Sequence, residues 1–162
     1  MQISPIFIAG CFTDALAMHY SIRRANAADL PSVSTLLGSH DLPTDGIGPH
    51  IDTFLVAVTP EGDLLGSAGL EVYPDAALLR SVAVSAAHHG LGLGGQLTEA
   101  ALHYARHRGI PDVYLLTETA SAFFPRYGFA PVERSEVPTS IQQTAEFSTL
   151  CPSSAVVMHY AT

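Results

Sequence analysis

Hydrophobic and polar residues are arranged along the chain in patterns that predict both strands and helices. Short apolar or alternating runs bounded by Gly, Pro, Asn or Asp predict strands at 21–25, 54–58, 64–73, 77–84, 113–117, 129–133 and 155–160. Helices are expected at 26–39, from a glycine-rich turn at 90–95 to Gly109, at 121–127 and at 138–146. This order predicts a mixed α/β (α+β) domain, with an antiparallel front and a strand–helix–strand crossover behind it.

The stretch 78–109 combines a buried strand, a glycine-rich turn and a long helix. Four glycines stand in the turn, namely Gly90, Gly92, Gly94 and Gly95. Without a β-carbon, each allows the backbone to approach a ligand closely. The first turn of a helix has unpaired N–H groups and a partial positive charge, which favour a phosphate. The sequence therefore predicts a phosphate or pyrophosphate site between strand and helix.

Three other interpretations of this turn are weaker. The spacing of the glycines does not match the G-x-G-x-x-G fingerprint of dinucleotide-binding folds, and the turn follows an antiparallel meander rather than a first strand. A P-loop needs a lysine that the turn lacks. A tight turn without a ligand would need fewer glycines than the four found here.

Composition indicates one folded domain and excludes several partners. Of 162 residues, 48% are hydrophobic and 14% charged, which is typical of a globular chain. We expect a single domain at 21–162, preceded by an extension at 1–20 whose role the sequence does not indicate. The net charge of −8 disfavours nucleic acid and acidic membranes as partners. Two cysteines, Cys11 and Cys151, and the absence of a long apolar run favour a cytoplasmic protein.

The turn resembles the acetyl-CoA-binding motif of the GCN5-related N-acetyltransferase (GNAT) superfamily, Gln/Arg-x-x-Gly-x-Gly/Ala. The segment HGLGLG at 89–94 matches this motif except at its first position, where His89 replaces Gln or Arg. The resemblance implies that the preceding strand pairs with the pantetheine arm and that the turn holds the pyrophosphate. The implied cofactor residues are Val82, Ala83, Val84, His89, Gly90, Leu91, Gly92, Leu93, Gly94 and Gly95.

A second GNAT signature, an aromatic pair followed by Gly-Phe, is similar to the segment FFPRYGF at 123–129. Segments within 64–160 most resemble the arsenic-resistance N-acetyltransferase branch and, more distantly, the acetyltransferase domain of N-acetylglutamate synthases. The resemblance implies a GNAT fold whose sheet is mostly antiparallel and is splayed between the strands at 78–84 and 113–117. It also implies acetylation of the amino group of a small amino-acid-like substrate, with acetyl-CoA as co-substrate and no metal.

Acyl transfer to an amine needs a base, because an ammonium must lose a proton before it attacks a thioester. Glu71 is the candidate catalytic base, since it interrupts an apolar strand next to the cofactor strand. A strand-end carboxylate that faces water or pairs with Arg80 is nearly as well supported. Many relatives carry a tyrosine general acid where this chain has Phe124, so the general acid is unassigned. Tyr127, three residues later, fits a position near Phe124 on the same helix face and a core position equally well.

Arg80 and Thr117 are the candidate substrate-binding residues. A guanidinium within an apolar strand needs a partner, which is either a substrate carboxylate held by two hydrogen bonds or the carboxylate of Glu71, unless the arginine faces outward at a sheet edge. Thr117 ends the central strand, where open sheets place ligands, although its hydroxyl equally suits a helix cap. The Gly- and Pro-containing loop at 41–49 is expected to border the substrate.

Two further groups of residues could carry chemistry, but the sequence favours a simpler interpretation of each. Cys151 is interpreted as a small buried hydrophobe rather than an acyl carrier. His103 and His107, with Glu99 on the same side of the long helix, have a spacing that can bind zinc, but the apolar residues fall on another face. A position on the solvent-exposed face of the helix therefore explains these three residues better than a zinc site does.

We therefore predict an acetyl-CoA-dependent N-acetyltransferase that acts on a small-molecule amine. The alternatives are acetylation of a protein or peptide amine and a non-catalytic acyl-CoA sensor, the latter favoured by the missing tyrosine. An exposed edge expected at 155–160 is compatible with a homodimer.

Overall fold

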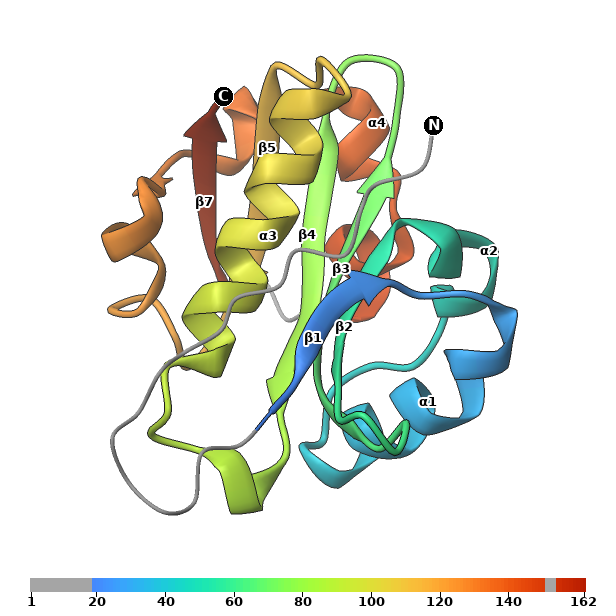
Figure 1. Ribbon diagram of the computed structural model, residues 1–162. Helices are drawn as coiled ribbons and strands as arrows, with labels where there is room; N and C mark the ends of the chain where they lie inside the picture. The colour runs from blue at the N-terminus through green and yellow to red at the C-terminus, as the bar shows by residue number, and fades with distance from the viewer. Residues whose placement is uncertain (1–18, 151–153) are drawn as a thin grey trace.

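A computed structural model describes residues 19–150 and 154–162 (Figure 1). Its strands form one seven-stranded sheet in the order β1-β2-β3-β4-β5-β7-β6, in which only β4 and β5 pair in parallel. The strands are β1 Ser21–Arg24, β2 Phe54–Val58, β3 Leu64–Val72, β4 Ala77–Val84, β5 Asp112–Thr117, β6 Ala130–Pro131 and β7 Val156–Ala161. The expected mixed and mostly antiparallel sheet is confirmed.

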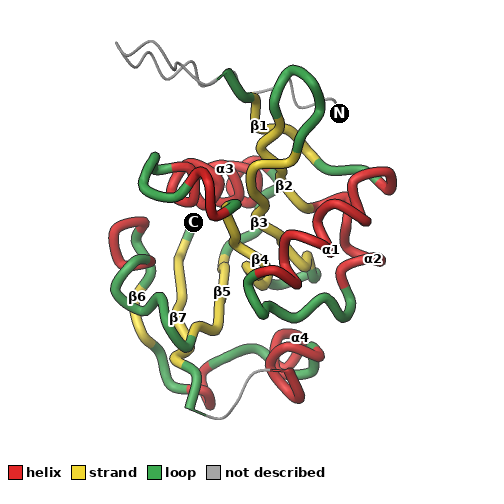
Figure 2. The backbone as a smooth tube through the Cα atoms, turned by 90° about the horizontal axis from the view of Figure 1, so that it is seen from below, coloured by secondary structure: helices red, strands yellow, loops and turns green. Residues whose placement is uncertain are grey.

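Helices cover both faces of this sheet (Figure 1 and Figure 2). They are α1 Leu30–Ser39, α2 Ile47–His50, α3 Leu93–His107 and α4 Thr139–Gln142. The helix α3 packs on one face, whereas α1, α2 and α4 pack on the other. Strand alternation explains this division: Leu55 of β2 packs with α3, and the next residue, Val56, packs with α1.

A capped 3-10 turn, Ala27–Asp29, leads directly into α1. Asn26 accepts a hydrogen bond from the Ala28 N–H, and the Asp29 carboxylate accepts one from the Asn26 N–H, which forms a capping box. The Arg23 guanidinium of β1 donates to both oxygens of Asp29, at 2.8 and 2.9 Å. These contacts connect the first helix to the edge strand.

The strand β4 carries a bulge at the point where it leaves β5. Gly69 pairs with Arg80 and Ser67 pairs with Ala83, so β4 has an extra residue between these pairs, and Ser81 adopts φ = 58°. In the other direction, β4 pairs with β5 only at Ala77–Val113 and Leu78–Tyr114. The two strands diverge beyond these pairs, as the expected splay between 78–84 and 113–117 requires.

The C-terminal part of the sheet differs from prediction at its edge. The strand at 155–160 was expected to be exposed, but β6 pairs with the outer side of β7 through Ala130–His159 and Pro131–Met158. The sheet therefore ends at β6, an edge position that tolerates Pro131 because no ladder N–H is needed there. The homodimer was expected because of an exposed edge at 155–160, and β6 occupies that edge.

Several short elements are also smaller than predicted. The segment 121–127 contains only a 3-10 turn, Phe124–Tyr127, which ends at Gly128 with φ = 94° as expected of a helix stop. The strand expected at 129–133 is reduced to β6, and the helix expected at 138–146 is α4 followed by a π-helical turn, Glu146–Leu150. Prolines within or beside these segments remove backbone donors and shorten regular pairing.

Some predictions fall outside the described residues, namely the role of 1–18 and the interpretations of Cys11 and Cys151. No helix within 19–150 or 154–162 is long and apolar enough to cross a membrane.

Candidate active site

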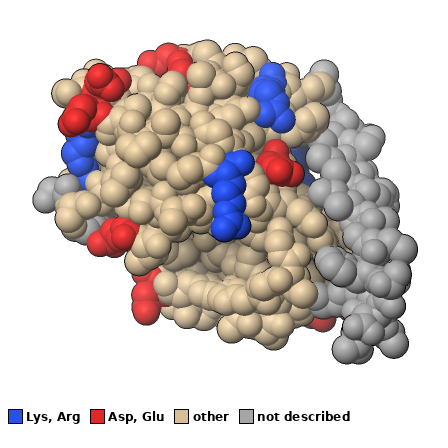
Figure 3. All heavy atoms as spheres, turned by 90° about the vertical axis from the view of Figure 1, so that its left-hand side faces the viewer, with Lys and Arg blue, Asp and Glu red and all other residues tan. Residues whose placement is uncertain are grey.

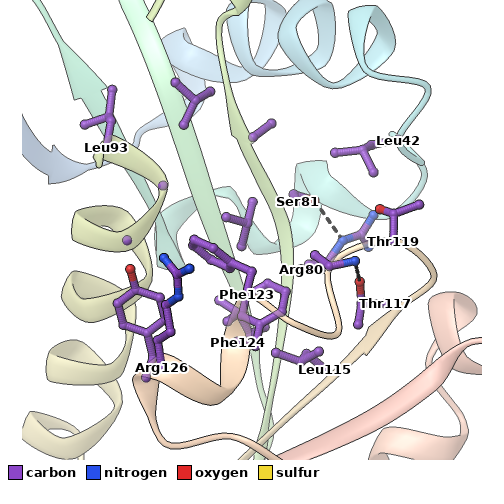
Figure 4. Close-up of a pocket in the computed structure, with 18 of the residues that line it drawn as sticks. Leu42, Arg80, Ser81, Leu93, Leu115, Thr117, Thr119, Phe123, Phe124 and Arg126 are labelled. Carbon is purple, nitrogen blue, oxygen red and sulfur yellow. Dashed lines mark hydrogen bonds between the residues drawn. The ribbon is translucent and has the colours of Figure 1, made fainter. Parts of the chain in front are cut away.

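A cleft with a volume of about 960 Å³ opens where β4 and β5 diverge (Figure 4). Its walls come from β4, the glycine-rich turn, the first turn of α3, the end of β5 and the aromatic segment that follows. The predicted cofactor residues that line it are Val82, Ala83, Val84, His89, Gly90, Gly92, Leu93, Gly94 and Gly95. Leu91 does not line the cleft, and this residue is 48% exposed.

The glycine-rich turn leaves the start of α3 open to a ligand. Gly90 and Gly92 have φ values of 83° and 76°, which favour glycine, and a β-carbon at either position would meet no atom within 4 Å. Gly92 is the N-cap of α3 and provides no side-chain cap. The N–H groups of the first helical turn therefore remain for an anion.

His89 is anchored on the cofactor strand. Its Nε2 lies 2.7 Å from the carbonyl oxygen of Val84, and because that oxygen only accepts, Nε2 must carry the proton. The ring of His40 stacks on His89 with 5.5 Å between centroids. The histidine that replaces Gln or Arg in the motif is thus held against β4 at the mouth of the cleft.

Arg80 is fully engaged within the protein. Its side chain is 1% exposed, and Nη1 lies 3.2 Å from Oε2 of Glu71. Nε lies 3.3 Å from Oε2 of Glu146 and 3.1 Å from the Ser81 hydroxyl, and Nη2 donates to the Pro43 carbonyl. The ion pair with Glu71, one of the alternatives drawn from the sequence, is the arrangement present. Glu146 was not anticipated, because no local pattern connects it to a strand so distant in sequence.

Glu71 sits behind Arg80 and does not line the cleft. Its Oε1 accepts a hydrogen bond from the Tyr73 hydroxyl at 3.0 Å and lies 3.3 Å from Nε2 of His50. Burial, followed by the hydrogen bond and charge of Glu71, raises the pKa of Tyr73 to about 12. Tyr73 therefore stays neutral and donates to Glu71 throughout the neutral range.

The far end of the cleft is bounded by the end of β5 and the loop before α2. Thr117 lines the cleft, and its Oγ1 accepts a hydrogen bond from the Ala120 N–H at 2.9 Å. This is the capping arrangement, and it leaves the hydroxyl proton for another acceptor. Leu42 also lines the cleft, and Pro43 contacts Arg80, so the loop at 41–49 borders this end as expected.

Aromatic residues form the wall opposite β4. Phe123 packs edge-on against Phe124, with 5.0 Å between ring centroids, and lies at 5.1 Å from Tyr127. A β-carbon on Gly95 would lie only 2.0 Å from the Tyr127 hydroxyl, so the tyrosine reaches α3 because Gly95 has no side chain. Arg126 lines the same wall (Figure 4). The sequence showed the motif but not which of its residues face the cleft.

The histidines of α3 form no metal site with other residues that the structure describes. The rings of His103 and His107 stack at 6.2 Å between centroids on the exposed side of the helix. Within the described part of the chain, no group of three or more His, Cys, Asp or Glu residues is placed to hold a metal ion.

Comparisons with known proteins agree with this geometry. The family model described as "Acetyltransferase (GNAT) family" matches residues 21–129. An amino-acid acetyltransferase of Mycobacterium tuberculosis is 29% identical over 131 residues, which are 74% of this chain and 74% of that protein. An uncharacterized N-acetyltransferase of Chlorobaculum tepidum is 28% identical over 139 residues, covering 81% of this chain and 86% of that protein.

Solved structures of this fold include CoA complexes. Rv2747 from Mycobacterium tuberculosis, solved with CoA, has a TM-score of 0.73 at 25% identity and covers 87% of this chain and 98% of its own. N-acetylglutamate synthase from Neisseria gonorrhoeae, complexed with coenzyme A and L-arginine, has a TM-score of 0.72 at 22% identity. That match covers 88% of this chain but only 33% of the synthase, so the chain spans about a third of its length. The chain belongs to the GNAT acetyltransferase family and is an N-acetyltransferase with acetyl-CoA as its co-substrate.

Proposed function

We propose that this enzyme transfers the acetyl group of acetyl-CoA to the amino group of a small amino acid or of a toxic analogue of one. The observation that carries this proposal is the continuity of the cleft, which runs from the open start of α3, along β4, to Arg80 and Thr117. A cofactor bound along β4 would bring its thioester toward these two residues. The names of the amino-acid acetyltransferase and the N-acetylglutamate synthase support an amino-acid acceptor.

The reaction is a direct transfer within a ternary complex. The neutral amine attacks the thioester carbonyl, the C–N bond forms, and the C–S bond breaks as CoA thiolate leaves; the proton that the attacking nitrogen then loses neutralises the thiolate. The ammonium form of the acceptor must first lose a proton, for which Glu71 is the candidate base. Because Glu71 lies behind Arg80 and outside the cleft wall, water must carry the proton to it.

Recognition of an acceptor carboxylate is assigned to Arg80 and Thr117. The guanidinium already contacts two carboxylates, so a substrate carboxylate must share Nη2 with the Pro43 carbonyl or compete with Glu146 for Nε. The free proton of the Thr117 hydroxyl supplies a further donor at the same end. An arsenic-containing amino-acid analogue belongs to this class, in agreement with the resemblance of segments within 64–160 to arsenic-resistance enzymes.

A second candidate is acetylation of a cationic amine, such as a basic peptide or a polyamine. Its support is the net charge of −8, which favours an acceptor that carries positive charge.

The discriminating experiment measures release of CoA thiol with a panel of acceptors. The panel contains neutral, acidic and basic amino acids, an arsenic-containing analogue, a polyamine and a basic peptide. We expect turnover with one or more amino acids, whereas turnover with the polyamine or peptide alone would favour the second candidate. Binding of acetyl-CoA without turnover on any amine would make the protein an acyl-CoA sensor.

Substitution of Thr117 tests the acceptor end directly. Thr117→Val removes the hydroxyl with little change of volume, and we expect it to raise KM for the acceptor while KM for acetyl-CoA changes little. Thr117→Ser is the matched control because it keeps both the cap on Ala120 and the free donor. Equal acceptor KM values for the two variants would remove Thr117 from the binding site.

A further inference from the structure

Arg126 differs from the other cationic side chains of this protein. All seven are arginines, and six have a partner in the structure. The partnered ones and their contacts are Arg23 with Asp29, Arg24 with the Asp52 carbonyl, Arg80 with Glu71 and Glu146, Arg106 with Tyr160, Arg108 with Tyr104, and Arg134 with the Ala155 carbonyl. Within the described residues, Arg126 makes no hydrogen bond or ion pair. It is also exposed and lines the cleft.

The backbone of Arg126 is fixed beside the start of α3. It belongs to the 3-10 turn Phe124–Tyr127, which Gly128 terminates and whose Phe124 is buried in the core. The next residue, Tyr127, places its hydroxyl against Gly95 in the first turn of α3. Figure 4 shows the Arg126 side chain extending from this turn toward α3 and the ring of Phe123. A rigid support therefore presents a free guanidinium next to the unpaired N–H groups of the helix.

The charge of the cleft is divided between its two ends. Glu146 is the one carboxylate in the described wall, and it lies with Arg80 at the acceptor end. Apart from Arg126, the rest of the described wall includes glycines, aromatic rings and the two histidines His88 and His89. The face shown in Figure 3 carries scattered charges and no continuous basic patch. In a chain of net charge −8, a local cation is the kind of group that would attract an anionic cofactor.

We propose that Arg126 binds a phosphoryl group of acetyl-CoA, as the cationic partner of the α3 N-terminus. The proposal rests on acetyl-CoA as the co-substrate. A guanidinium donates two parallel hydrogen bonds to a phosphate, while the helix N–H groups donate from the other side. Two sources of phosphate fit this chemistry, the pyrophosphate and the 3′-phosphate of the cofactor. Arg126 is then a determinant of cofactor specificity rather than of the acyl-transfer step.

The test combines substitutions with a truncated series of cofactors. Arg126→Gln removes the charge and keeps the length of the side chain, and Arg106→Gln is the matched control, since it changes the net charge equally but lies outside the cleft wall. Calorimetric Kd values are compared for acetyl-CoA, acetyl-dephospho-CoA and acetyl-pantetheine. We expect Arg126→Gln to raise Kd for acetyl-CoA roughly tenfold, with partial recovery in Arg126→Lys and little change in Arg106→Gln.

The three cofactors distinguish the two phosphates. A tenfold effect on acetyl-CoA that disappears with acetyl-dephospho-CoA assigns the 3′-phosphate, whereas an effect that disappears only with acetyl-pantetheine assigns the pyrophosphate. An effect that persists with acetyl-pantetheine, or one no larger than that of Arg106→Gln, overturns the proposal. Failure of the unmodified enzyme to bind acetyl-CoA is a separate result, which would contradict the cofactor itself rather than the role of Arg126.

Discussion

Arg80 and Glu71 form an ion pair inside the sheet, with 3.2 Å between Nη1 and Oε2 and side-chain exposures of only 1% and 7%. They come from the adjacent strands β4 and β3, and the same guanidinium also contacts Glu146 at the acceptor end of the cleft. A buried charge is tolerated only where a partner compensates for its lost hydration. The pair therefore connects the acceptor end of the cleft to the stability of the fold.

Arg80→Met should lower the free energy of unfolding by about 3–5 kcal/mol, because it leaves buried carboxylates without their cation. Glu71→Gln should have a smaller effect, about 1–3 kcal/mol, since an amide oxygen still accepts from Tyr73. The double variant should lose less than the sum of the two single losses. Urea denaturation of the four proteins measures this coupling, and additive losses would mean that the two side chains do not stabilise each other.

The pH dependence of turnover tests whether Glu71 is also the base. Glu71→Gln should lower kcat/KM most at neutral pH and below, where the acceptor amine is mostly protonated and a base is needed. The control is Tyr73→Phe, which removes one neighbour of the carboxylate and keeps the carboxylate itself. A profile that keeps its shape in Glu71→Gln would leave Glu71 with a purely structural role.

Much of this site could be expected from the sequence, because local patterns report on it directly. The glycines of the turn, the apolar strand before it and the aromatic segment all identify themselves by residue type and spacing. Arg80 and Glu71 could be singled out for the same reason, as charges that interrupt apolar strands. The choice between an ion pair and a substrate clamp was not available, since it depends on the register in which Gly69 meets Arg80 and on the bulge at Ser81.

What the sequence did not reveal depends on contacts between distant segments. Glu146 reaches Arg80 only because the C-terminal turn folds back over the sheet, and no local pattern encodes this. The edge at β7 was misjudged for a similar reason: a strand is expected at 129–133, but no local pattern shows that its two-residue remnant β6 pairs with β7. That Arg126 makes no hydrogen bond or ion pair with the described residues is evident only from the folded structure, in which the other six arginines have partners.

Gly92→Asp should abolish detectable binding of acetyl-CoA, because it places a carboxylate where the phosphate is expected. Any non-glycine residue at φ = 76° is also strained by roughly 1 kcal/mol. Gly62→Asp is the control for that strain, since Gly62 has φ = 91°, equally open space and a position in the turn between β2 and β3. Calorimetry and thermal denaturation separate the two effects. Cofactor affinity that falls equally in both variants would remove the phosphate assignment at Gly92.

Acid should remove a stabilising contact at the start of α1. The hydrogen-bonded Arg23 guanidinium lowers the pKa of Asp29 below its ordinary value, against the effect of burial, and the Asn26 N–H adds to this. A carboxyl with a lowered pKa stabilises the fold above its ordinary pKa of about 3.9 and loses that contribution as the pH falls through its folded value. Asp29→Asn should therefore cost about 1 kcal/mol at pH 7 and progressively less below about pH 4.

Thermal denaturation as a function of pH measures this difference. Asp63→Asn is the control, because Asp63 is exposed in the turn between β2 and β3 and its side chain has no ion pair among the described residues. A difference between the unmodified protein and Asp29→Asn that stays constant down to about pH 2 would show that the charge of Asp29 is not responsible.

Gly95 and Tyr127 should be strongly coupled. Alanine normally stabilises a helix by about 0.5–1 kcal/mol relative to glycine. Here its β-carbon would lie 2.0 Å from the Tyr127 hydroxyl oxygen and 2.9 Å from Cζ. Gly95→Ala should instead destabilise the protein by about 1–3 kcal/mol and weaken acetyl-CoA binding, since Tyr127 must move within the cleft wall. Stability comes from urea denaturation and affinity from calorimetry.

The double variant separates this clash from other effects of the substitution. Tyr127→Phe removes the oxygen that the added β-carbon would meet, so Gly95→Ala combined with Tyr127→Phe should be more stable than Gly95→Ala alone. The recovery should be incomplete, because the ring carbon nearest to the added β-carbon remains. If Gly95→Ala stabilises the protein as an ordinary helix position would, Tyr127 does not pack against α3, and the rigid support inferred for Arg126 is lost with it.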